Sequence, residues 1–347
     1  MPRMMNKKKI ALILLGIVVA AFLLFRPSFT TIHILYDDEI DPVLRSQMQL
    51  NSLMVLNALR DEEYDVVLSF FGRKPGIEEI KSALPAARDK MGSLIASAKF
   101  KNFHDHYVTG LAGTETGNTV MSAHALTDEP GSYFVYQDTD TQNAYISLFT
   151  SEVSQTEALY TIVWGEYEDG WKIHNFDIAS IGWSGKRGPD WFEEAKKVRR
   201  ESGDVAAYLT MKAVSGLFRP SRVFEWKDLE GPVNDFFAEM YKSVASKLSE
   251  PLVVQELDSK PAIYGLDATT VNELPGQIIP TFQYVSKYKQ SQADLIMEEA
   301  HRMAPLMEKY FEGVNDLGEN LLFVAYEEPP IDPKKKYKTY RTVVEIK

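Results

Sequence analysis

The stretch from Leu159 to Ile181 constrains the fold of this chain more than any other, because it reads as two strands joined by a tight turn. Asp169-Gly170 suits the positive φ angles that a short hairpin turn requires. Large apolar side chains alternate with smaller or polar ones before the turn, at Tyr160, Ile162 and Trp164. This period of two predicts an antiparallel β-hairpin.

The second strand of this hairpin changes phase partway along its length. Trp171 and Ile173 share one face of the strand, whereas Phe176 and Ile178 share the other. One additional residue in one strand of a pair produces such a change and increases the local twist. The sequence therefore predicts a β-bulge, or a strand buried on both sides, and with it a strongly curved sheet.

Helical patterns precede the hairpin and strand patterns surround it. Apolar residues recur at steps of three, four or seven over residues 42–71, with Asp61-Glu62-Glu63 as a break, and a second helix is expected over 77–95. Further strands are expected over 100–108, 119–126, 132–137 and 144–149. Helices followed by a meandering antiparallel sheet indicate an α+β domain.

Three segments carry a resemblance to a known family: NALRDEEYDVVLSFF, GIEEIKSALPAARDKMGS and ALYTIVWGEYEDGWKIHNFDI. They are similar to the helices and the final hairpin of nuclear-transport-factor-2-like domains, over about residues 40–185. The resemblance implies a cone-like sheet wrapped around helices, with a pocket inside the cone. Some members of that family are isomerases or dehydratases, and many others bind ligands or partners.

The remaining chain divides into two further units. Residues 189–250 are expected to form a helical bridge, in which Asp190 caps a helix, Gly203 ends it, and the following helix completes a pair similar to one tetratricopeptide-type hairpin. A smaller α+β unit follows over 251–347, with Pro305 interrupting its helix. The expected domains are thus 1–35, an anchor and spacer, then 36–188, 189–250 and 251–347.

The N-terminus carries a targeting pattern. Lys7-Lys8-Lys9 precede an uncharged apolar run, Ile10 to Phe25, which Arg26 closes. As a helix this run would cover about 24 Å, and flanking lysines and arginine can extend its reach in the bilayer. The basic N-terminal side predicts a single-pass cell-membrane anchor with the body outside the cytoplasm. A cleaved signal peptide, giving a secreted or periplasmic protein, is the alternative.

The charge and motif content exclude several classes of function. Beyond Arg26 the chain carries 33 basic and 49 acidic residues, a formal charge of −16, so nucleic acid is not an expected partner. Cysteine is absent, which excludes disulfides and thiolate chemistry. Phosphate-binding glycine loops, the serine-hydrolase elbow and the H-E-x-x-H zinc motif are also absent, and no cofactor is expected.

Polar candidates for chemistry gather in the segment NFHDHYV. His104 and His106 would point to the same face of a strand and bind one metal ion if His124 supplied a third ligand. Asp105 and His106 are candidate acid–base groups, since burial in the cone would raise the pKa of a carboxylate. Histidines without a metal and solvated carboxylates are the simpler interpretation.

Aromatic residues offer a second kind of candidate site. Trp164, Trp171, Tyr107 and His174 would bind a ligand by stacking if they lined a groove, whereas core packing would explain them without any ligand.

The sequence is consistent with two functions. One is a membrane-anchored, extracytoplasmic binding protein whose cone and bridge hold a protein or cell-envelope ligand. The alternative is an isomerase-, dehydratase- or hydrolase-like enzyme that uses the cone pocket for acid–base chemistry.

Overall fold

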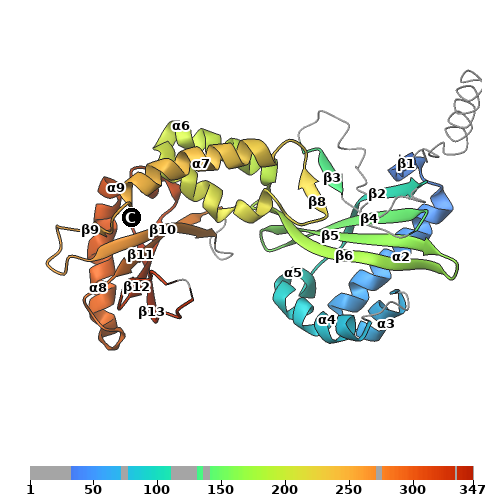
Figure 1. The fold of residues 1–347 in the computed structure, drawn as a ribbon, viewed down its shortest axis with the longest axis horizontal. Helices are drawn as coiled ribbons and strands as arrows, with labels where there is room; N and C mark the ends of the chain where they lie inside the picture. The colour runs from blue at the N-terminus through green and yellow to red at the C-terminus, as the bar shows by residue number, and fades with distance from the viewer. Residues whose placement is uncertain are drawn as a thin grey trace, which may run out of the picture.

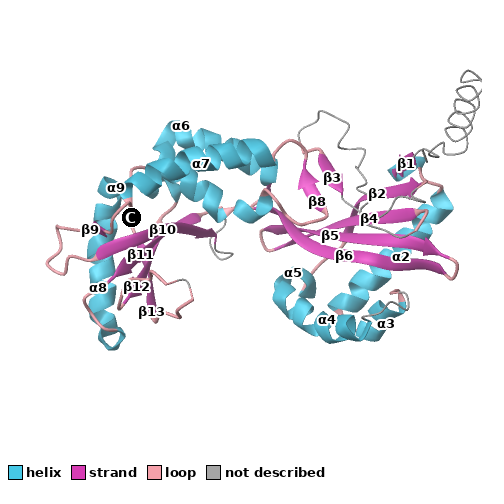
Figure 2. Cartoon of the chain, viewed as in Figure 1, coloured by secondary structure: helices cyan, strands magenta, loops and turns pink. Residues whose placement is uncertain are grey.

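The computed structural model describes residues 33–71, 77–110, 131–135, 141–270, 276–332 and 334–346. Two β-sheets lie toward opposite ends of an elongated molecule, and a pair of helices joins them (Figure 1). Both parts contain helices and strands (Figure 2), so the predicted α+β class is confirmed. The predicted anchor, residues 10–25, lies outside the described residues. Within them, no helix is long and apolar enough to cross a membrane.

The first unit is a curled, six-stranded antiparallel sheet with helices on one face (Figure 1). Its strands are β1 (His33–Tyr36), β2 (Lys101–Thr109), β4 (Ala144–Val153), β5 (Thr156–Tyr167), β6 (Gly170–Trp183) and β7 (Lys186–Arg187), in that spatial order. Its helices are α2 (Pro42–Arg60), α3 (Tyr64–Ser69), α4 (Ile77–Met91) and α5 (Ser93–Ala96), with the 3₁₀ turn η1 (Asp37–Glu39) before them. This arrangement confirms the predicted cone-like sheet with N-terminal helices.

The helix α2 follows directly from its local sequence. The Asp41 side chain caps it by accepting hydrogen bonds from the N–H groups of Val43 and Leu44, and Pro42 occupies the first turn. Its buried stripe, which includes Met48 and Leu56, packs against the concave face of the sheet. The helix ends at Arg60, where the acidic break was predicted.

The predicted bulge is present in β6. Val163 pairs with Asn175 and the next residue, Trp164, pairs with Ile173, so His174 is the additional residue. A second register shift lies near the other end of the strand, at Ile181. Both insertions increase the twist and curvature of the sheet. The hairpin turn itself consists of Glu168 and Asp169, one position earlier than predicted, and Gly170 follows with a φ of 105°.

Two strands differ from the sequence-based boundaries. Most of strand β1, residues 33–35, falls in the predicted spacer, and Tyr36 begins the next predicted domain. The strand nevertheless pairs with β2 as an edge of the large sheet. Strand β3 (Tyr133–Val135) was expected in that sheet, but it pairs with β8 (Phe224–Trp226) of the bridge instead. Both faces of the sheet are therefore covered, one by α2 to α5 and the other by the β3–β8 ribbon and the bridge.

The bridge consists of α6 (Gly188–Ala213), the 3₁₀ turn η3 (Ser215–Leu217) and α7 (Glu230–Lys247). Helix α6 begins after Arg187 rather than at Asp190, whose side chain accepts a hydrogen bond from the Arg187 N–H. Gly203 interrupts α6 with φ 90° and ψ −178°. The chain reverses there, because Phe192 before the interruption and Phe218 beyond it have ring centroids 6.5 Å apart. The predicted break at Gly203 is confirmed.

We expect Gly203→Ala to lower the free energy of unfolding by about 1–3 kcal/mol, because this backbone conformation is open to glycine and strained for other residues. Gly231→Ala is the matched control. Gly231 lies inside α7, and an added Cβ meets nothing within 4 Å. There alanine should stabilise the protein by about 0.5–1 kcal/mol. Urea denaturation of both variants measures the contrast, and equal effects would contradict it.

The C-terminal unit is a five-stranded mixed sheet packed against helices. Its strands, in the order β13-β12-β11-β10-β9, are Thr339–Glu345, Asn320–Tyr326, Ile278–Val285, Ala262–Thr270 and Leu252–Val253. Helix α8 (Ala293–Met303) covers it, and Pro305 separates α8 from α9 (Met307–Tyr310) through the 3₁₀ turn η5 (Ala304–Leu306). The predicted interruption at Pro305 is thus present, since proline removes a helical hydrogen-bond donor.

Candidate functional site

Strand β2 places the two acid–base candidates on opposite faces of the large sheet. Asp105 points to the concave face and contacts helix α2 through Arg45 and Gln49. His106 points to the other face, where its ring contacts Tyr36 and Tyr133. Adjacent residues of a strand alternate in this way. Asp105 and His106 therefore do not form a catalytic pair.

Asp105 is the centre of a buried polar network. One of its carboxylate oxygens, Oδ2, accepts hydrogen bonds from Arg45 Nε at 3.2 Å and from Gln49 Nε2 at 2.7 Å. The Asp105 N–H donates to Asp37 Oδ1 at 3.0 Å. Arg45 also pairs with Asp37 and with exposed Asp38, at 3.2 and 2.7 Å. The network therefore fastens η1 and α2 to strand β2.

The pKa values in this network follow from burial and from hydrogen bonds. Burial raises the pKa of Asp105, although the bonds from Gln49 and Arg45 oppose the rise. Burial, and then the Asp105 charge, raise the pKa of Tyr145. Asp105 Oδ1 and Tyr145 Oη are both buried, and neither has a hydrogen bond of normal geometry, although the groups are close enough to interact electrostatically. These are the features of a structural network with one incompletely satisfied carboxylate.

The histidine candidates are only partly brought together. His104 and His106 do share a face, and both rings contact Tyr133. His104 Nδ1, however, lies 2.8 Å from Asp37 Oδ2, so that carboxylate orients the ring. His124 lies outside the described residues. Among the residues that the structure describes, no three His, Asp or Glu side chains are arranged to hold a metal ion.

The aromatic candidates divide into one core residue and a partly exposed group. Trp164 is fully buried, and its Nε1–H donates to Ser52 Oγ at 3.0 Å. Trp171 and Tyr107 are partly exposed, with ring centroids 6.3 Å apart. His174 is the partly exposed bulge residue of β6. Trp164 therefore packs the core, whereas Trp171 and Tyr107 lie together near the rim of the concave face.

Side chains fill the inside of the cone. The concave face of the sheet contributes buried Tyr145, Phe149, Tyr160, Ile162 and Trp164 to one apolar core with α2 and α5. Aromatic rings in that core pack edge to face; the ring centroids of Phe70 and Trp164, for example, lie 5.6 Å apart. The depth of the cone is thus occupied by packing at these positions.

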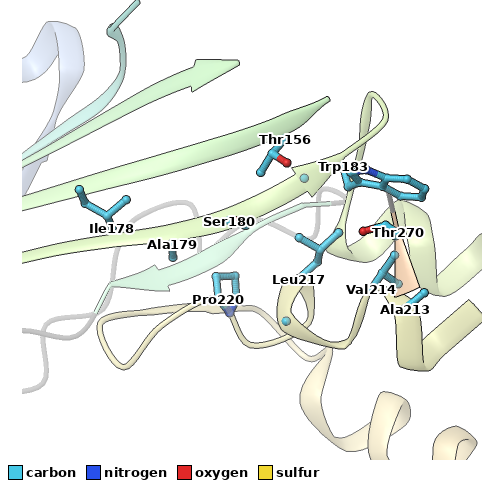
Figure 3. A pocket seen from close by; sticks show the side chains of 12 residues that line it. Thr156, Ile178, Ala179, Ser180, Trp183, Ala213, Val214, Leu217, Pro220 and Thr270 are labelled. Atoms are coloured by element: carbon cyan, nitrogen blue, oxygen red, sulfur yellow. The ribbon is translucent and has the colours of Figure 1, made fainter. Parts of the chain in front are cut away.

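A cavity of about 390 Å³ lies instead at the junction of the sheet, the bridge and the C-terminal unit. Figure 3 shows Ile178, Ala179 and Ser180 along one strand, with bridge residues Leu217 and Pro220 facing them. The full lining is Thr156, Ile178, Ala179, Ser180, Gly182, Trp183, Ala213, Val214, Gly216, Leu217, Pro220 and Thr270. All three parts of the protein thus contribute to one cavity.

The lining of this junction cavity suits binding rather than proton transfer. Among the residues that the structure describes, the lining contains no carboxylate, imidazole, amine or guanidinium group, and its polar side chains are the hydroxyls of Thr156, Ser180 and Thr270 and the indole of Trp183. Trp183 is 4% exposed, and its Nε1–H has no hydrogen-bond partner within the part of the chain that the structure describes. A buried unpaired donor costs free energy unless a ligand or water satisfies it. The Trp183 N–H is itself buried, so it is an unsatisfied donor beside the junction cavity and not an exposed one.

A second, charged cavity of about 460 Å³ adjoins the first, since Gly182 and Trp183 line both. Three of its charged side chains, Glu157, Lys186 and Arg187, form ion pairs. Arg187 holds the Glu157 carboxylate with two bonds of 2.7 and 2.8 Å, and Lys186 holds Glu194 at 2.7 Å. These ion pairs therefore stabilise the wall of this cavity beside Trp183.

No sequence pattern indicated the junction cavity directly. Its lining comes from positions between Thr156 and Thr270, which only the docking of three units brings together. The cluster of tryptophans at 164–191 was visible, and Trp183 belongs to it. Comparison with protein-family models, with curated proteins and with solved structures finds no match to this chain.

Proposed function

We propose that this chain is a membrane-anchored, extracytoplasmic binding protein that holds a protein or cell-envelope ligand at the junction cavity. The observation that carries the proposal is the chemistry of the lining. Hydroxyls and apolar side chains suit recognition, and the described residues of the lining include no ionisable group for acid–base catalysis.

The membrane part of the proposal rests on the sequence. Three lysines, a sixteen-residue apolar run and a closing arginine are typical of an anchor whose N-terminal side stays in the cytoplasm. The acidic body beyond it disfavours nucleic acid and anionic headgroups as ligands. A protein or a neutral or cationic envelope component is therefore the class of ligand that we propose.

The second candidate is an acid–base enzyme, favoured by one observation. Asp105 is a buried carboxyl with a raised pKa beside Tyr145, and the resemblance to nuclear-transport-factor-2-like domains is to a fold that hosts enzymes. Against this candidate, both groups are fully buried and Asp105 Oδ2 is engaged by Arg45 and Gln49. Binding remains the better-supported function.

Site-specific photo-cross-linking in intact cells tests the binding proposal. We expect a photoreactive amino acid at Pro220, in the cavity lining, to give a discrete cross-linked species. The same group at exposed Glu78 of α4 should give none.

Protease added to spheroplasts should degrade the body of both photoreactive variants. A protease-protected body would contradict the location. A small molecule that co-purifies and is turned over, with turnover abolished by Asp105→Asn, would favour the enzyme.

A further inference from the structure

Strand β6 has an open edge over part of its length. From Asn175 to Ser180 it pairs with β5 in regular register, between the two bulges. On its other side, β7 reaches only Gly182 and Trp183. An edge strand presents N–H and C=O groups that another extended chain can pair with. Among the described residues, no strand pairs with these six on that side, so they form one uninterrupted stretch of open edge.

The direction of each backbone group along this edge follows from the neighbouring turn. Val153 and Thr156 close the two-residue turn between β4 and β5, so Thr156 turns its backbone groups toward β4. Because this direction alternates, even-numbered residues of β5 face β4 and odd-numbered ones face β6. The β6 partners of the even-numbered residues must then point outward. They are Phe176, Ile178 and Ser180.

A contact within the protein supports this assignment. Ile173 pairs with the even-numbered Trp164, and its N–H donates outward to the Phe70 carbonyl at 2.8 Å. Phe71 forms a parallel bridge to Ile173 at the same place. The edge of β6 thus already donates a hydrogen bond to a backbone carbonyl of another segment. Farther along, Phe176, Ile178 and Ser180 have no such backbone partner among the described residues.

The open edge leads into the junction cavity. Ile178 and Ser180 belong to the open edge and also line the junction cavity. Trp183, whose buried indole N–H is unpaired among the described residues, lines the cavity beyond Ser180 (Figure 3). Outward N–H and C=O groups and a partly apolar cavity match the repeating chemistry of an extended peptide. The stretch 175–180 lacks proline and has one charged residue, Asp177, so little protects it from such pairing.

We propose that the β6 edge binds an extended, basic peptide segment of a partner protein by strand addition, with one apolar side chain in the junction cavity. Positive charge on the segment follows from the −16 charge of the body and from Asp177 on the edge itself. The proposal rests on the proposed binding function and specifies its ligand class. Main-chain hydrogen bonds supply the affinity, and the cavity selects the side chain.

The test uses the full chain in detergent and an array of short synthetic peptides whose net charge ranges from negative to positive. We expect basic peptides with a central apolar residue to bind. Amide hydrogen exchange with the tightest binder should then slow about tenfold at Phe176, Ile178 and Ser180. Exchange at Asp177 and Ala179 should not change, because these residues already bond to β5.

A pair of variants isolates the backbone donor. Ser180→Pro removes an outward N–H, a change that edge strands tolerate, and should weaken peptide binding about tenfold relative to Ser180→Ala, which keeps that N–H. If Ser180→Pro fails to fold, the exchange pattern of the unmodified chain decides. Binding without the alternating protection, or no preference for basic peptides, overturns strand addition. If no peptide binds while Pro220 still cross-links a partner, this inference fails and the binding function stands.

Discussion

Replacing Arg45 by methionine should lower the free energy of unfolding by about 3–5 kcal/mol near neutral pH. The substitution removes the cation beside Asp105, whose side chain is fully buried. A buried carboxylate that loses its partner keeps its desolvation cost without the compensating attraction. Denaturant unfolding monitored by tryptophan fluorescence measures the loss.

The loss in Arg45→Met should depend on pH. Burial already raises the pKa of Asp105 in the folded protein, so its contribution to stability is complete below the unfolded pKa and is lost as pH rises through the folded pKa. The deficit should therefore shrink toward acidic pH. Asp37 acts on the deficit in the same direction, because the stabilisation that it gains from Arg45 is also lost toward acidic pH. Burial alone would raise its pKa, but bonds from His104 and Asp105 and the Arg45 charge lower it, so its contribution is lost as pH falls.

Two further variants separate charge from packing at this site. Arg45→Lys keeps the positive charge, although it loses the planar fork, and should recover part of the stability. The double variant Arg45→Met with Asp105→Leu removes both charges and should be more stable than Arg45→Met alone. A deficit that is the same at all pH values, or a double variant that is less stable than both single ones, would contradict a charge-based network.

Replacing Trp164 by alanine should cost about 3–5 kcal/mol, as expected for removing a fully buried aromatic side chain. Its indole also donates to Ser52 Oγ, which in turn donates to Ser147 Oγ at 2.8 Å, so the change breaks a link between sheet and helix. Trp171→Ala is the matched control on the same face of the sheet. Because Trp171 is partly exposed, its removal should cost clearly less, about 1 kcal/mol.

The comparison of the two tryptophan variants bears on function as well as stability. Trp164 was a candidate ligand-binding residue in the sequence, and the structure assigns its ring to the core. If Trp164→Ala folds with nearly unchanged stability, its ring is not needed for packing and the core assignment fails. Thermal and urea denaturation of both variants, with cross-linking at Pro220 as the binding readout, distinguish the two roles.

The parts of the fold that sequence reasoning captured are those set by neighbouring residues. The phase change between Ile173 and Phe176 predicted a bulge or a strand buried on both sides, and the structure has a bulge at His174. Gly203 and Pro305 marked helix interruptions that the structure contains. Each depends on a local rule: the period of two, the positive φ of glycine, or the missing N–H of proline. Such rules need no knowledge of distant contacts.

The parts that could not be predicted depend on contacts between distant positions. Strand β3 is three residues long and pairs with β8, about ninety positions later, so no local sequence pattern indicates which strand it pairs with. The junction cavity likewise forms only where Thr156 of the large sheet and Thr270 of the C-terminal unit lie close to the bridge. The placement of Asp105 and His106 on opposite faces was available from strand alternation. Their individual partners, Arg45 and Tyr133, were not.

The two-faced burial of the large sheet has a consequence for how the chain matures during synthesis. Residues up to Ile178 supply one complete core, between the concave face and helices α2 to α5. The opposite face, with Ile146, Leu148 and Val163, is covered mainly by residues from Trp191 to Val233. Domains tend to fold as they emerge, N-terminal part first. A nascent or prematurely ended chain therefore presents a finished sheet with one apolar side still bare, which makes it a substrate for chaperones and a nucleus for aggregation.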